Sequence, residues 1–352
     1  MLKEEWKKIF LKRYYLFVLV AIMIAEGALC VLQSSNLFQS HSDKEIYELY
    51  VNTFCGPLTE KKKTTIDLIL ACFNDDTLLS EMTLPQESRN AIEKLLSASV
   101  KGRLGVERFR EDYEYATAKH GRSVIHTTAW EFLFGTERID FFCVLAVILF
   151  TILSFVAENE TDITSIKYTT PQGKTKLYRI DLFTGILISM LLSVIASLMR
   201  LCVALVRFSF HNFAAPAESL SLFENTPYSF SLLGSYLVIT GIKALGTAAF
   251  LAFCFLLGNL LASSVAVVMG SLLAVLLPQY VLSAPISYYL PPVSLMLGNG
   301  FFFGNVTIEI ENALPLAVSS ATGKAALPVS FLGAAALFIS AFYVVRKRRE
   351  HL

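Results

Sequence analysis

Charged residues are scarce for a chain of this length. Only 17% of the 352 residues are Asp, Glu, Lys or Arg, whereas soluble domains usually carry about 25%. The shortage is local, because Lys243 is the only residue of this set between Asn225 and Ile308. A water-soluble surface cannot be built from such a stretch. The composition excludes a secreted enzyme and a disordered tail, and it predicts a polytopic membrane protein.

The short motifs of soluble catalysis are also absent. The chain has no Gly-x-x-x-x-Gly-Lys-Ser/Thr loop that could hold nucleotide phosphates, no Gly-x-Ser-x-Gly and no His-Glu-x-x-His. It has no Cys-x-x-Cys, and its five histidines are scattered. We therefore expect no catalytic residue, no metal site and no cofactor bound by this chain. The net charge of +1, without a basic tract that contains aromatic residues, gives no indication of nucleic acid binding.

The sequence contains several long hydrophobic runs. One crossing of a bilayer needs roughly 20 apolar residues, and the runs predict six. The first is interpreted as a retained anchor, because it is longer than a signal-peptide core and no Ala-x-Ala cleavage site follows it. The stretch Leu232–Ala284 suits two crossings, with a reversal at Gly258-Asn259. The predicted spans are 14–33, 138–157, 182–206, 232–257, 260–284 and 328–345.

The distribution of Lys and Arg predicts the orientation of the spans. Thirteen basic residues lie in the N-terminal segment 1–13, the connection 158–181 and the tail 346–352. The short connections of the other side, 208–231 and 285–327, contain only Lys324. This asymmetry predicts a plasma-membrane protein with both termini in the cytoplasm.

The segment 34–137 lies outside in this topology and has a mixed surface of 12 Lys or Arg and 16 Asp or Glu. Apolar residues recur at helical spacing, and Pro57, Asn74 and Pro85 stand where helices would end. We therefore predict an all-α membrane protein with six transmembrane helices and a helical extracellular domain between the first and second. The apolar positions are Ile46, Leu49, Tyr50, Phe54, Ile66, Ile69, Leu70, Phe73, Leu104, Phe109 and Tyr113.

The six cysteines fall into two groups. Four lie in or beside hydrophobic spans, where cysteine behaves as a small apolar residue. Cys55 and Cys72 lie in the extracellular segment, where a disulfide is permitted. Either a disulfide or two separate buried thiols on adjacent helices would explain this pair. The four others are Cys30, Cys143, Cys202 and Cys254.

Three charged residues interrupt the spans: Glu26, Arg200 and Lys243. An isolated charge in a bilayer costs at least about 2.5–3.5 kcal/mol, so each should face protein or water. Pairing of Glu26 with Arg200 or Lys243 is compatible with their depths. The charges could line a substrate path or form a gate, or they could be a static interhelical ion pair.

The connection 158–181 is the most polar of the short ones. Acidic residues at its start suit a helix N-terminus, Ile163 and Ile166 give an apolar face, and Pro171 ends the pattern before Gly173 allows a turn. This pattern predicts a short helix that lies across the inner membrane surface.

The chain resembles the permease subunit of type-2 ATP-binding-cassette exporters. The resemblance rests on the layout of the whole chain and on acidic residues after the second span, followed by the turn Thr169–Lys174. The segment Ala215–Leu220 also resembles the family before the fourth span. Asp181 stands where the family usually has a basic residue, with Arg179 nearby.

The resemblance implies a separate cytoplasmic ATPase that holds ATP and Mg, and a second permease chain, identical or different. It also implies that 285–327 forms short re-entrant helices; an aromatic belt at the membrane interface would also explain that stretch. The residues implied in contact with the ATPase are Glu158, Glu160, Ile163, Ile166, Thr170, Pro171, Gly173 and Lys174.

The expected function is therefore that of an exporter permease without its own ATPase, which moves an amphipathic cargo outward. Peptide, lipid and drug are all compatible with the spans. The alternative is a membrane sensor or tether whose extracellular domain binds a ligand and signals through the spans.

Overall fold

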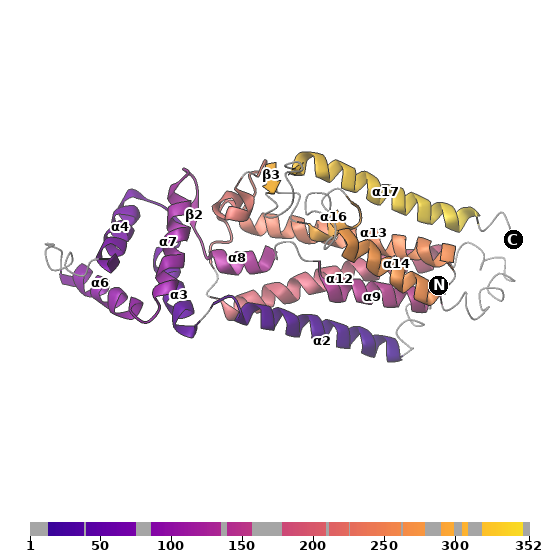
Figure 1. Ribbon diagram of the computed structural model, residues 1–352, viewed down its shortest axis with the longest axis horizontal. Helices are drawn as coiled ribbons and strands as arrows, with labels where there is room; N and C mark the ends of the chain where they lie inside the picture. The colour runs from indigo at the N-terminus through magenta and orange to yellow at the C-terminus, as the bar shows by residue number, and fades with distance from the viewer. Residues whose placement is uncertain are drawn as a thin grey trace, which may run out of the picture. The chain divides into compact units, whose positions relative to one another are not determined.

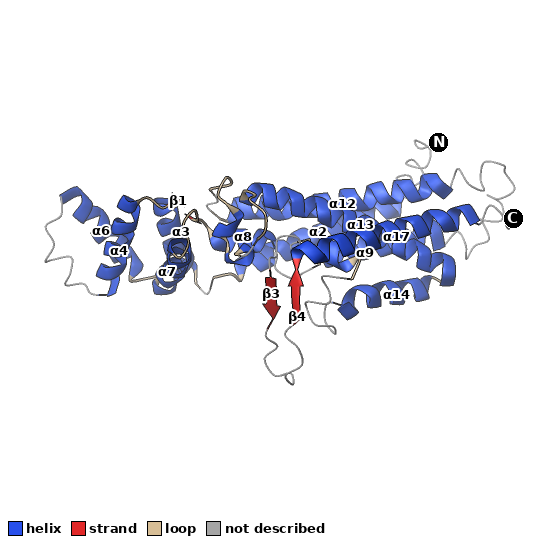
Figure 2. Ribbon diagram, turned by 90° about the horizontal axis from the view of Figure 1, so that it is seen from above, coloured by secondary structure: helices blue, strands red, loops and turns tan. Residues whose placement is uncertain are grey.

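The computed structural model is mostly helical (Figures 1 and 2). It divides into two compact units, which are described separately. Unit 1 comprises 1–29, 136–200 and 237–352, and unit 2 comprises 30–135 and 201–236. The residues that the structure describes are 13–38, 40–74, 86–134, 139–156, 178–208, 211–224, 226–261, 263–278, 290–298, 305–308 and 319–347.

Among the residues that the structure describes, four helices are long and apolar enough to cross a membrane: α2 (Arg13–Ser35), α12 (Tyr178–Arg207), α13 (Leu232–Leu261) and α17 (Gly323–Lys347). They confirm a mostly helical, membrane-associated chain. Two further apolar helices are shorter than the spans expected at 138–157 and 260–284. One is α9 (Phe141–Thr151), which continues as the π-helix η1 (Ile152–Val156), and the other is α14 (Ser264–Leu276).

The reversal between α13 and α14 is not where the sequence predicted it. α13 continues through Gly258 and Asn259, because the Asn259 side-chain amide donates to the Phe255 carbonyl one turn earlier (2.7 Å). Gly258 packs closely against Val156 of η1, so its small size is needed for packing and not for a turn. The chain turns back after Leu261. Cys254 Sγ then lies 3.2 Å from Ser271 Oγ, as expected for an antiparallel pair of helices.

A short buried helix, α16 (Val293–Leu297), lies within the segment 285–327. It packs against α13 at Gly246 and ends at Gly298, whose φ of 73° lies in the left-handed region that favours glycine. The same segment contains the antiparallel strands β3 (Asn305–Ile308) and β4 (Ser319–Thr322), which the sequence did not predict. The re-entrant segment and the aromatic belt both stay predictions for 285–327.

Unit 2 is a small helical domain. Its helices are α3 (His41–Phe54), α4 (Glu60–Asn74), α6 (Gln86–Ser99), α7 (Arg103–Thr117) and α8 (Thr127–Phe134). Ser40 caps α3, because its Oγ accepts from the Asp43 amide (3.1 Å) and donates to the Asp43 carboxylate (2.6 Å). A two-residue ladder pairs β1 (Gly56–Pro57) with β2 (Ser123–Val124).

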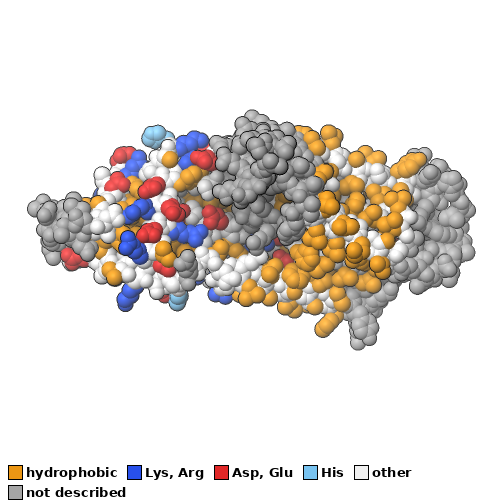
Figure 3. Space-filling view, viewed as in Figure 1, with side chains coloured by type: hydrophobic (Ala, Val, Ile, Leu, Met, Phe, Trp, Pro, Cys, Tyr) orange, Lys and Arg blue, Asp and Glu red, His pale blue; other side chains and the backbone are white. Residues whose placement is uncertain are grey.

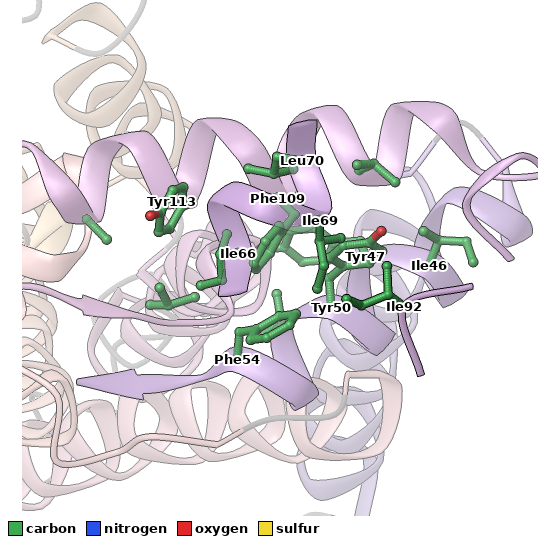
Figure 4. Close-up of a cluster of buried hydrophobic side chains, with 14 of the residues drawn as sticks. Ile46, Tyr47, Tyr50, Phe54, Ile66, Ile69, Leu70, Ile92, Phe109 and Tyr113 are labelled. Atoms are coloured by element: carbon green, nitrogen blue, oxygen red, sulfur yellow. The ribbon is translucent and has the colours of Figure 1, made fainter. Parts of the chain in front are cut away.

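The core of unit 2 is aromatic (Figure 4). Tyr50 and Phe54 of α3 lie against Phe109 of α7, with ring centroids 5.1 and 6.0 Å from that of Phe109. Ile66 and Ile69 of α4 complete the cluster. These are positions of the apolar pattern in the sequence, so the pattern located three of the five helices and most of their buried faces. Leu49 and Leu104 of that pattern are instead exposed.

Cys55 and Cys72 are thiols in the structure and are not joined to each other. Cys72 is buried in the core of unit 2, whereas Cys55 is partly exposed and its Sγ lies 4.0 Å from the Asn52 carbonyl. The alternative of separate thiols therefore fits the structure better than the disulfide.

The connection 207–231 was expected to be a separate loop, but it packs within unit 2. Glu218 pairs with Lys119 (2.7 Å), and the Ser219 hydroxyl accepts from the Ser123 amide (3.0 Å). Glu224 pairs with Arg122 (3.1 Å), which also lies over the Tyr115 ring. Two chain segments about a hundred residues apart therefore form one domain.

The two units differ in the side chains that they expose. On the face shown in Figure 3, charges of both signs cover the helices of unit 2, whereas hydrophobic side chains cover the helices of unit 1. In the most apolar 18-residue stretch of each helix, only 17% of the residues are buried in α2 and in α17, compared with 61% in α13. The outer helices of unit 1 thus present apolar surface that suits contact with lipid.

Gly246 and Gly241 offer a matched test of the packing of α16. A Cβ at Gly246 would lie 2.6 Å from main-chain atoms of Leu295 and Met296, whereas a Cβ at Gly241 would meet none of the described atoms within 4 Å. We expect Gly246→Ala to destabilise the protein by about 1–3 kcal/mol through overpacking. Gly241→Ala should be neutral or slightly stabilising, because alanine favours helix.

The measurement is the thermal unfolding midpoint of the two purified variants in detergent. An unchanged midpoint in Gly246→Ala, or equal losses in both variants, would contradict the contact between α13 and α16.

Candidate functional site

Four charged side chains meet inside unit 1, and each is contributed by a different helix or helix start. Glu26 lies on α2, Asp140 immediately precedes α9, Arg200 lies on α12, and Lys243 lies on α13. All four are buried, with relative exposures of 2, 9, 7 and 5% respectively. We call these four residues the charge cluster.

Asp140 is the centre of the charge cluster. Its Oδ1 accepts a hydrogen bond from Arg200 Nη2 (2.9 Å), and its Oδ2 lies 3.6 Å from Lys243 Nζ. Glu26 Oε1 lies 3.9 Å from the same Arg200 nitrogen. One carboxylate thus joins two cations, and the second carboxylate balances the remaining positive charge.

The charge cluster has zero formal net charge, with two carboxylates and two cations. Burial of unpaired charge is far costlier than burial of a compensated set. Three apolar helices and the start of a fourth are therefore held together by charges that cannot leave one another without a large penalty. This constraint limits the rotation of α2, α12 and α13 about their own axes, because α12 and α13 must present their cations to Asp140 and α2 must present Glu26 to Arg200.

Close packing surrounds the charge cluster. Gly27, next to Glu26, faces Met199, next to Arg200, and a Cβ at Gly27 would lie 2.8 Å from the Met199 methyl group. On the other side, a Cβ at Gly298 would lie 2.9 Å from Cγ of Lys243. Glycine therefore allows α2 to approach α12, and it allows the end of α16 to cover the Lys243 side chain.

The three intramembrane charges that the sequence identified are brought together, and Glu26 lies next to Arg200 as expected. The sequence reasoning missed Asp140, although this residue lies within the span predicted at 138–157. Because Asp140 stands near the start of that run, it was not counted among the intramembrane charges. A search for charges inside the span boundaries would have found it.

The residues expected to contact an ATPase lie outside the part of the chain that the structure describes. These residues are Glu158, Glu160, Ile163, Ile166, Thr170, Pro171, Gly173 and Lys174. Their expected role stays a prediction.

A polar groove lies between α4 and α7 of unit 2, with a volume of about 570 Å³. Several of the charged and polar side chains that line it bind other residues of unit 2. Tyr113 donates to Asp67 (2.7 Å), Arg110 donates to Asn74 (3.0 Å), and Lys63 pairs with Glu60 (3.0 Å). Among the described residues that line the groove, no side chain is both buried and without a hydrogen-bond partner, so the groove gives no specific indication of a ligand.

Within the described ranges, no three His, Cys, Asp or Glu side chains are grouped so that they could hold a metal ion. Comparison of the chain with family models, with curated proteins and with solved structures gave no match in any of the three. Functional inference therefore depends on the arrangement of this chain's own helices and charges.

Asp140→Asn tests whether the charge cluster holds the helices together. This change leaves Arg200 and Lys243 facing one carboxylate, so one buried positive charge is uncompensated. We expect a loss of about 3–5 kcal/mol in stability, typical of a broken buried pair. Glu45→Gln, at an exposed carboxylate of α3, serves as the control and should change stability little.

The double variant Asp140→Asn/Lys243→Met restores electroneutrality and should be more stable than Asp140→Asn alone. Thermal unfolding in detergent measures all three variants. A double variant no more stable than Asp140→Asn would show that charge balance is not what the charge cluster provides.

Proposed function

We propose that this chain is the membrane permease subunit of an ATP-driven exporter of the ATP-binding-cassette type, and that it moves an amphipathic cargo. Under this proposal six helices cross the membrane, unit 2 lies outside, and a separate ATPase binds the segment between the second and third spans. The observation that carries the proposal is the ion pair between Asp140 and Arg200, which joins the two helices on either side of that segment.

The composition of unit 2 supports the predicted topology. Unit 2 contains both 30–135 and 201–236, and salt bridges join these two parts. Under the proposal, both parts therefore lie on one side of the membrane. The chain between them contains α9–η1 and α12 (Figure 1), so these helices together would form one passage across and one passage back.

The helices that follow support an even number of crossings. α13 leaves unit 2, α14 returns antiparallel to it, and α17 is long enough to cross again. With α2 as the first span, this arrangement supports N- and C-termini on the same side. The basic residues at 1–13 and 346–352 favour the cytoplasm for that side.

The arrangement also suggests how force would pass from an ATPase to the spans. η1 ends at Val156 and α12 begins at Tyr178, so the proposed ATPase-binding segment connects these two helix ends. From Tyr178 to Arg200, α12 extends roughly 33 Å. Because the Arg200 end of α12 is bound to Asp140, a displacement of the segment would move α9 and α12 together. Glu26 and Lys243 would pass this motion to α2 and α13.

Replacement of 158–174 by a Gly/Ser sequence of equal length tests the proposal. The replaced residues lie before the start of α12, so the fold should be retained. We expect the unmodified full chain, purified from its native membranes, to retain an associated ATPase with a P-loop and Mg-ATP hydrolysis. The replaced chain should lose both.

Lys61→Glu, an exposed charge reversal on α4, serves as the control and should leave the associated ATPase in place. ATP hydrolysis by the isolated chain, or equal ATPase recovery with the replaced segment, would contradict the proposal.

A further inference from the structure

The carboxylate of Asp112 is partly buried in unit 2, and no cation of the described residues forms a salt bridge with it. Asp112 is on α7, and its Oδ2 accepts from the Tyr47 hydroxyl of α3 at 2.6 Å. The Thr127 hydroxyl, at the first residue of α8, lies 2.9 Å from Oδ1 and 2.8 Å from Oδ2. The Tyr47 and Thr127 hydroxyls are themselves 3.0 Å apart. Three elements of unit 2 therefore meet at three polar side chains.

A count of hydrogens shows which protonation state fits these distances. The three side chains form three pairs in hydrogen-bond contact, and a hydrogen bond in each pair needs one hydrogen. With an ionised Asp112, only the two hydroxyl hydrogens are present, so one contact has none. With a protonated Asp112, three hydrogens close a ring: Tyr47 donates to Asp112, Asp112 donates to Thr127, and Thr127 donates to Tyr47.

The charged neighbours of Asp112 supply the missing compensation only in part, because Arg108 favours the carboxylate whereas Glu131 opposes it. Arg108, one turn earlier on α7, donates to Glu131 of α8 (3.3 Å) and to the Leu37 carbonyl (3.2 Å). The carboxylate of Glu131 adds negative charge near Asp112. Burial raises the pKa of Asp112 to about 7, and the hydrogen bonds from Tyr47 and Thr127 oppose this shift only in part.

We propose that Asp112 is a proton-binding site that controls how the start of α8 is held against α3 and α7. With the proton bound, the ring of three hydrogen bonds fixes Thr127. When the proton leaves, one contact loses its hydrogen, a negative charge remains inside the domain, and the start of α8 loosens. α8 is the last helix of unit 2 before the chain enters α9, so the extracellular pH would act at the entrance to the second span.

The sign of the effect follows from the direction of the pKa shift. The pKa of Asp112 in the folded domain is raised above the ordinary value of about 3.9. The stabilising contribution of the proton is therefore complete below about pH 4 and is lost as the pH rises through about 7.

His126, the neighbour of Thr127, acts in the opposite direction. Burial lowers the pKa of His126, while Glu48 of α3, with Oε1 3.9 Å from Nε2, opposes the shift. Protonation of a buried imidazole destabilises the fold as the pH falls, so His126 cannot produce a loosening at high pH. A loosening of α8 as the pH rises would therefore be caused by Asp112 and not by His126.

A tryptophan on α8 provides the measurement. Trp6 and Trp130 are the two tryptophans of the chain, and Trp130 is fully buried and stacked on Phe134. In the full chain with Trp6→Phe, purified in detergent, the emission of Trp130 reports α8 alone. We expect a red shift as the pH rises from 5 to 9, with a midpoint of about 7.

Asp112→Asn should abolish this transition and keep the emission blue at pH 9, because the neutral amide can donate to Thr127 and accept from Tyr47. His126→Gln is the matched control and should retain the transition. Thr127→Val removes one member of the ring, so its emission should already be red-shifted at pH 5. If Asp112→Asn does not fold, the pH titration of Trp130 emission in Thr127→Val tests the proposal instead.

The proposal is overturned if the Trp6→Phe chain shows no transition between pH 5 and 9. It is also overturned if the transition persists in Asp112→Asn, if His126→Gln abolishes it, or if Thr127→Val titrates like the parent. None of these outcomes depends on the proposed export function.

Discussion

Apolar helices that carry charge must bring those charges together, and this requirement organises unit 1. Asp140 lies within 3.6 Å of both Arg200 and Lys243, and Glu26 approaches Arg200 from α2. Removal of a single member would leave a buried charge without compensation. The positions of Gly27 and Gly298 follow from the same requirement, because both allow neighbouring segments to approach the charged side chains closely. The charge cluster therefore determines which faces of α2, α12 and α13 turn inward, and the remaining faces are left apolar.

Unit 2 depends on a different constraint, the joining of two distant chain segments. The salt bridges Lys119–Glu218 and Arg122–Glu224 bind the connection after α12 to the domain that precedes α9. An exposed salt bridge contributes little alone, but Arg122 is itself buried, and the buried Phe223 packs edge-on against Phe134. Under the proposed topology, the two segments therefore share one side of the membrane. The same domain contains the hydrogen-bonded side chains of Tyr47, Asp112 and Thr127. Through them, we propose, pH controls how firmly the start of α8, the helix before α9, is held.

Hydrophobic length and helical periodicity located most of the helices, because both are local properties of the sequence. The periodic positions Ile46, Tyr50 and Phe54 are buried as predicted, and the long apolar runs correspond to α2, α12, α13 and α17. The prediction of a reversal at Gly258-Asn259 was wrong, because these two residues also suit the inside of a closely packed helix. The role of Asp140 and the union of 207–231 with unit 2 depend on contacts between residues far apart in the chain, which periodicity does not encode. The helix α6 was also missed, since its polar residues weaken the apolar pattern.

The account as a whole requires that 158–174 and unit 2 face opposite sides of the membrane. Reactivity of single cysteines toward a membrane-impermeant maleimide in intact cells tests this most directly, in a background that carries Cys55→Ser and Cys202→Ala. With cysteine at Lys61 of unit 2 or at Lys174 of the connecting segment, the account predicts labelling of the first in intact cells and of the second only after permeabilisation. Labelling of both positions in intact cells would contradict the account.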